Sequence, residues 1–97
     1  MKLMTKAIEN VIPGLNEQEE LGEDAIVHVK FFSPYSDWTW YATEYDPDER
    51  MFFGLVDGFV KELGYFSLDE LESAIGAVGQ PLIERDRYFK LTKLSDV

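Results

Sequence analysis

The stretch WTWYATEY, residues 38–45, alternates tryptophan and alanine with threonine and tyrosine. This period of two is typical of a β-strand, because successive side chains of a strand point to opposite faces. Trp38, Trp40 and Ala42 are predicted to share one face of the strand. The other face would carry Thr39, Tyr41, Thr43 and Tyr45. Since buried aromatic side chains dominate the energetics of small cores, we expect both tryptophans to be buried.

Further strands are predicted around this stretch. Residues 25–32 alternate as well, with Val27, Val29 and Phe31 on one face. Their other face would carry Ile26, His28, Lys30 and Phe32. Residues 51–56 and 62–66 are also rich in β-favouring side chains, and turns are predicted at residues 33–37 and 46–49. Strands that follow one another in sequence usually pair, so we expect an antiparallel meander, with the tryptophans beside Val27, Val29 and Phe53.

Two short helices flank the predicted strands. Thr5 can cap a helix that runs to about Val11, with Ala7, Ile8 and Val11 as its apolar face, before Pro13-Gly14. Ser67 and Glu70 form a capping box for a second helix, whose buried stripe would be Leu68, Leu71 and Ile75, with Gly76 at its end. Residues 15–24 are expected to be an exposed loop, and residues 82–91 a last strand or an extended strip. The predicted fold is one α+β domain over residues 1–97, with a four- to five-stranded antiparallel sheet and two short helices.

The composition excludes several classes of enzyme. The chain has no cysteine and one histidine, which excludes thiol catalysis, disulfides and the usual zinc sites. No G-x-S-x-G or glycine-rich phosphate loop is present. Asp46, Asp48 and Glu49 resemble cation ligands, but an EF-hand would require glycine where Met51 stands. We therefore expect no catalytic residue, no cofactor and no metal, and a carboxylate hydrolase is only a third alternative.

The charge distribution favours a protein partner. The 9 basic against 19 acidic residues give a net charge of −10, and residues 7–84 hold seventeen acids against Lys30, Arg50 and Lys61. Such a chain is repelled by nucleic acids and anionic membranes, so neither is expected to bind directly. No apolar run is long enough for a membrane helix, and a cytoplasmic location is expected.

The candidate contact residues are clustered acids and two tyrosines. The acids are expected to be mostly exposed and to lie on one side of the domain, where they could imitate phosphates inside a basic channel. Tyr41 and Tyr45 could instead form an aromatic contact face, since tyrosine is enriched at binding hot spots. The predicted partner-binding residues are Glu17, Glu19, Glu20, Glu23, Asp24, Tyr41, Tyr45, Asp46, Asp48 and Glu49. The alternative is a generic adaptor or a homo-oligomeric module.

Several blocks of the sequence resemble a known bacterial family. WTWYATE at residues 38–44, FFGLV at 52–56, ELGYFSL at 62–68 and PLIERD at 81–86 are similar to domain-of-unknown-function family 2958, nearly end to end. The turn from Tyr45 to Arg50 is shorter than in many relatives. The family lends no catalytic residues, but its members are carried by plasmids, phages and conjugative elements. The resemblance therefore implies an inhibitor of a host nuclease or guide-RNA complex, of the antirestriction or anti-CRISPR kind.

Overall fold

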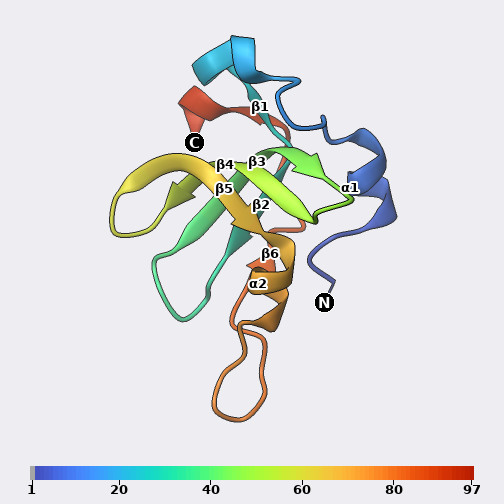
Figure 1. Ribbon diagram of the computed structural model, residues 1–97. Coiled ribbons are helices and arrows are strands. Elements are labelled where there is room, and N and C mark those ends of the chain that lie inside the picture. The colour runs from blue at the N-terminus through green and yellow to red at the C-terminus, as the bar shows by residue number, and fades with distance from the viewer. Residues whose placement is uncertain (1) are drawn as a thin grey trace.

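A five-stranded antiparallel sheet is the centre of the computed structural model, which describes residues 2–97 (Figure 1). Its strands lie in the order β5-β4-β3-β2-β6. Strands β2 to β5 form the predicted meander, and β6 returns from the C-terminal part of the chain to pair with β2. The α+β class is thereby confirmed. The strand bounds are β2 (Val29–Phe32), β3 (Thr39–Asp46), β4 (Met51–Asp57), β5 (Lys61–Ser67) and β6 (Glu84–Arg85).

A second, two-stranded sheet pairs β1 (Ile26–Val27) with β7 (Thr92–Lys93). The single strand predicted for residues 25–32 is therefore divided at His28, whose backbone N–H donates to the Ala42 carbonyl at 2.9 Å. Residues 29–32 pair with β3, whereas residues 26–27 pair with β7 in the C-terminal part of the chain. The prediction of alternating burial remains correct, because Val27, Val29 and Phe31 are all buried.

A β-bulge in β3 reverses the side-chain alternation of the quoted stretch. Ala42 pairs with Gly54 and Glu44 pairs with Phe53, so Thr43 is an extra residue. A bulge of this kind shifts every following side chain to the opposite face. The prediction that Tyr45 shares an outer face with Tyr41 is consequently wrong: Tyr45 lies in the core and is 3% exposed.

Aromatic side chains fill the core on one face of the sheet. The ring of Phe52 packs against those of Phe31, Tyr45 and Phe66, with centroid distances of 5.2, 4.6 and 5.2 Å. Leu68 and Leu71 of the second helix and further residues from both ends of the chain complete this cluster. The prediction of a buried tryptophan pair is wrong. Both tryptophans are only partly buried, and Phe53 is not among the core residues.

The tryptophans instead form a partly exposed cluster at the edge of the core. Trp40 packs against the buried core residues. The ring centroid of Trp38 lies 5.9 Å from that of Trp40 and 5.3 Å from that of the exposed Phe59. The hairpin between β4 and β5 carries Phe59, so this edge-to-face contact between Trp38 and Phe59 joins two hairpin loops. Sequence alternation could not show that these rings lie at an open corner of the sheet.

Both predicted helix caps are present. The Thr5 hydroxyl accepts from the Ile8 N–H, and the Ser67 hydroxyl accepts from the Glu70 N–H, each at 3.2 Å. The helices α1 (Lys6–Val11) and α2 (Leu68–Ser73) are short, and none of the helices in residues 2–97 could span a membrane. Three predicted contacts are wrong, because Ala7 and Val11 are exposed and Ile75 lies beyond the end of α2 in a bridge to Pro81. The 3-10 helices are η1 (Glu19–Asp24) and η2 (Leu94–Asp96).

The paired glycines of β4 and β5 offer a test of the packing between strands. A Cβ at Gly54 would overlap the backbone carbonyl of Tyr41, whereas a Cβ at Gly64 would meet no atom within 4 Å. We expect Gly54→Ala to lower the free energy of unfolding by about 1–3 kcal/mol, as overpacking does. The matched control, Gly64→Ala, should leave it within about 0.5 kcal/mol. Urea unfolding measures both, and equal effects would contradict the close approach at Gly54.

Candidate functional site

The side chain of Gln18 lies between two strands that the bulge has moved apart. Gln18 is 7% exposed, and its amide nitrogen donates to the carbonyls of Ile26 at 2.9 Å and Thr43 at 2.7 Å. Its amide oxygen accepts from the Ile26 N–H at 2.7 Å. The side-chain amide thus takes the place of a peptide group between β1 and β3. The prediction that residues 15–24 form an exposed loop is wrong at this residue.

Glu44 fixes the backbone beside Gln18. Its carboxylate is buried, at 4% exposed, and it accepts the backbone N–H groups of Asn16 and Gln18, each at 2.8 Å. Hydrogen bonds to an ionised acceptor are stronger than neutral ones, and here they satisfy a carboxylate that is out of water. Asn16 has a φ of 73°, a conformation that asparagine tolerates better than most residues. Residues 16–18 are therefore held against the sheet from two directions.

Around this anchor lies a rim of exposed carboxylates, which we call the acidic rim. It begins beside Asn16 and continues through η1, which contacts η2 near the C-terminus (Figure 1). Asp24 lies 3.7 Å from the Lys93 amine, and both side chains are more than half exposed. All members of the rim are exposed, as predicted: Glu17, Glu19, Glu20, Glu23 and Asp24.

The acids of the turn after β3 have different neighbours from the acidic rim. Asp48 and Glu49 are exposed, whereas Asp46 is partly buried and accepts the Asp48 N–H at 3.0 Å. Arg50 closes this turn and donates to the carboxylates of Asp69 and Glu72 in α2. The turn therefore adjoins α2 on the core side of the sheet, while Glu44 holds the acidic rim on the opposite side. The prediction that all the candidate acids lie on one side of the domain is wrong, because Asp46, Asp48 and Glu49 are separated from the acidic rim by the sheet.

The face of the sheet opposite the core carries exposed apolar side chains. Leu63 and Tyr65 are 58% and 61% exposed, and the Tyr65 ring lies 5.0 Å from that of Phe53. Together with the anchor and rim residues Gln18, Glu19 and Glu44 they line a hollow of about 250 Å³. An apolar floor with a carboxylate wall can hold the long stem and charged end of a lysine or arginine side chain.

The two tyrosines predicted as contact residues lie elsewhere. Tyr45 is in the core, where burial raises the pKa of its phenol, so it is not available to a partner. Tyr41 is partly buried, and the centroid of its ring lies 6.5 Å from that of Phe89. Burial raises the pKa of the Tyr41 phenol, and the negative charge of Asp57 raises this pKa further. The exposed tyrosine of the open face is Tyr65. Its position could have been found from the sequence, since it alternates with the core residue Phe66 in the predicted strand.

Metal-binding side chains are not brought together in the described part of the chain. No group of three or more histidine, aspartate and glutamate side chains in residues 2–97 is placed to hold a metal ion. His28 was predicted to be a sheet-surface residue, but it is partly buried, and desolvation lowers its pKa. Its Nδ1 atom is buried without a hydrogen-bond partner in the described part of the chain.

Comparison with known proteins gives a family and no activity. Residues 3–96 match the family described as "Protein of unknown function (DUF2958)". No curated protein and no solved structure is significantly similar to the chain. The resemblance drawn from the blocks at residues 38–44 and 62–68 is therefore confirmed, and the function must be argued from the surface itself.

The Gln18 anchor predicts a large effect from a substitution that keeps the side-chain volume. Gln18→Met removes three hydrogen bonds and leaves the Ile26 and Thr43 groups unpaired, so the free energy of unfolding should fall by at least about 2 kcal/mol. Amide hydrogen exchange should accelerate at Asn16, Gln18 and Ile26. The control, Gln80→Met in an exposed loop, should change stability by no more than about 0.5 kcal/mol. Unchanged exchange at Ile26 would show that the amide does not join the strands.

Proposed function

The chain belongs to the DUF2958 family, whose function is unknown, and we propose that it is a non-enzymatic domain that binds a strongly basic protein surface. The partner class with such a surface is a nucleic-acid-processing protein, such as a nuclease or a guide-RNA complex, whose channel is built to hold phosphates. Binding there would exclude the nucleic acid and inhibit the enzyme. This is the antirestriction or anti-CRISPR role that the mobile-element setting of the family suggests.

The observation that carries the proposal is the concentration of accessible, unneutralised carboxylates along the acidic rim. Asp24 is the one rim residue with a lysine or arginine within 4.0 Å, among the side chains that the structure describes. Exposed charges of one sign on a small domain produce a surface potential that accelerates encounter with an oppositely charged partner. With a net charge of −10 on 97 residues, the rest of the chain does little to offset this potential.

The rigid mounting of the rim also supports a binding role. Buried hydrogen bonds to Gln18 and Glu44 fix the segment that leads into η1. A surface that is ordered before binding loses less conformational entropy when the complex forms. The adjoining Leu63 and Tyr65 would add apolar contact area beside the charges.

A homo-oligomeric or adaptor role is the second candidate. It is favoured by the same exposed Leu63 and Tyr65, which lie on β5 at the edge of the five-stranded sheet. An edge strand with apolar side chains can pair with another chain. In that case association would depend on the apolar residues and would respond little to salt, because screening acts on charges.

Charge reversal distinguishes the two candidates. Glu19→Lys, Glu20→Lys and Asp24→Lys, introduced together, should weaken inhibition of purified restriction nucleases or guide-RNA nucleases by more than about tenfold. Raising salt from about 0.05 to 0.5 M should weaken the native protein similarly, mainly through a slower association rate. DNA-cleavage assays measure the inhibition, and stopped-flow binding measures the rate.

The matched control reverses three exposed acids outside the rim: Asp37→Lys, Glu62→Lys and Glu70→Lys. This variant has the same net charge as the rim variant and should retain most of the inhibition. Equal losses of inhibition in both variants would show that inhibition depends on the total charge and not on the acids of the acidic rim. Salt-independent binding that is lost on Tyr65→Ser would favour the adaptor alternative.

A further inference from the structure

One segment of this acidic chain gathers positive charge. Residues 85–93 contain Arg85, Arg87, Lys90 and Lys93. They begin beside β2 and end in β7, which pairs with β1. Arg85 pairs with Phe31 of that strand, and the Asp86 N–H donates to the Lys30 carbonyl at 2.9 Å. The proposed binding of a basic partner makes no use of this segment.

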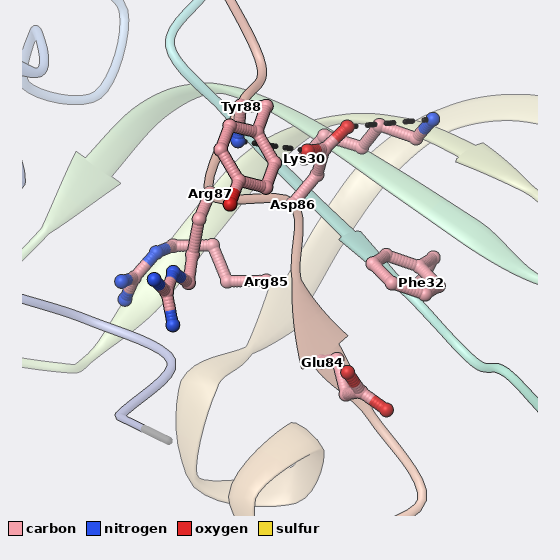
Figure 2. A pocket seen from close by; sticks show the side chains of 7 residues that line it. All are labelled: Lys30, Phe32, Glu84, Arg85, Asp86, Arg87 and Tyr88. Carbon is pink, nitrogen blue, oxygen red and sulfur yellow. Dashed lines mark hydrogen bonds and ion pairs between the residues drawn. The ribbon is translucent and has the colours of Figure 1, made fainter.

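Strand β6 and the turn that follows it place the acidic and the basic side chains of residues 84–87 apart. Figure 2 shows the guanidinium groups of Arg85 and Arg87 side by side on one side of the strand, with the carboxylates of Glu84 and Asp86 pointing away from them. Asp86 is directed to the Lys30 amine at 4.0 Å and also accepts the Tyr88 N–H at 2.9 Å. The Asp86 carboxylate is therefore engaged by the Lys30 amine and the Tyr88 N–H.

The guanidinium groups open onto a pocket of about 390 Å³ that residues from three parts of the chain line. Its other walls are formed by Ile8 of α1, His28, Val29, Asp86 and Phe89. Arg85 also donates to the Lys2 carbonyl, which holds its guanidinium beside the N-terminal segment. His28 adds a ring with an unpartnered buried nitrogen. The lining therefore combines two arginines and a histidine with one aspartate, and the Asp86 carboxylate is also engaged by Lys30 and the Tyr88 N–H. A site in which arginines outnumber carboxylates has the chemistry of an oxyanion site.

We propose that the pocket between Arg85, Arg87 and His28 binds the phosphate group of a small molecule. Planar guanidinium groups give paired hydrogen bonds to the oxygens of a phosphate, and two of them match its double negative charge better than the single charge of a carboxylate. His28 contributes its imidazole ring to the same lining. Phe89 and Ile8 leave an apolar wall for the organic part of a phosphate ester. This inference is independent of the role proposed for the acidic rim.

The experiment uses the only histidine of the chain as its reporter. The imidazole resonances of His28 are followed by NMR in the full-length protein while inorganic phosphate is added at constant ionic strength. We expect a saturable shift of these resonances, a similar shift with sulfate, and tighter binding of phenyl phosphate because its ring can contact Phe89. Acetate should produce no saturable shift at the same concentrations.

Two charge-matched variants decide the assignment. Arg87→Gln should weaken phosphate binding by at least about tenfold, since a charge-assisted contact is lost. Lys61→Gln removes the same charge from exposed β5 and should leave the affinity unchanged within about twofold. Both residues are exposed, and the amide spectrum reports whether each variant is folded. The absence of a saturable shift, an equal response to acetate, or an equal loss in both variants would overturn the proposal.

Discussion

The hydrogen bonds of a single glutamine amide connect the two sheets of this domain. The bulge at Thr43 turns β3 away from β1, and the Gln18 amide fills the gap with bonds to both strands. Without these bonds, buried peptide groups of Ile26 and Thr43 would have no partner, which is costly in a protein interior. Because Glu44 emerges from the same bulge and binds the Gln18 backbone, one irregularity in β3 positions the whole segment before η1. The acidic rim is thus a consequence of how the sheet is built.

The features that the sequence predicts well are those that depend on neighbouring residues. The meander, the hairpin turns and the caps at Thr5 and Ser67 follow from alternation and from side-chain hydrogen bonds three residues apart. Tyr45 shows where such reasoning fails, since one extra residue in a strand is invisible to a period of two. The prediction that Gln18 lies in an exposed loop is wrong for a different reason. A polar side chain among acids indicates an exposed loop unless its distant partners are known.

The candidate site also combines features that depend on neighbouring residues with features that depend on distant parts of the chain. Exposure of the rim acids could be predicted, because five carboxylates within eight residues cannot be buried without partners. The pocket at Arg85 and Arg87 could not, since His28 and Ile8 meet these residues only after the end of the chain has returned to β2. An acidic rim and a basic pocket in one small domain require different ligands. The charge of −10 therefore describes the average of the surface and conceals a region of opposite sign.

The pairing of β1 with β7 joins Ile26 to Lys93 and so connects the first strand of the chain to the last. The local meander of β2 to β5 can form while the chain is still being synthesised, but β1 and η1 lack their partners until residues 92–96 have left the ribosome. Contacts so distant in sequence form late in folding, because a long loop must first be closed. The outer side of the rim is therefore supported only after residues 92–96 have been made, and a product that stops before them would lack the contacts of β7 and η2 with β1 and η1.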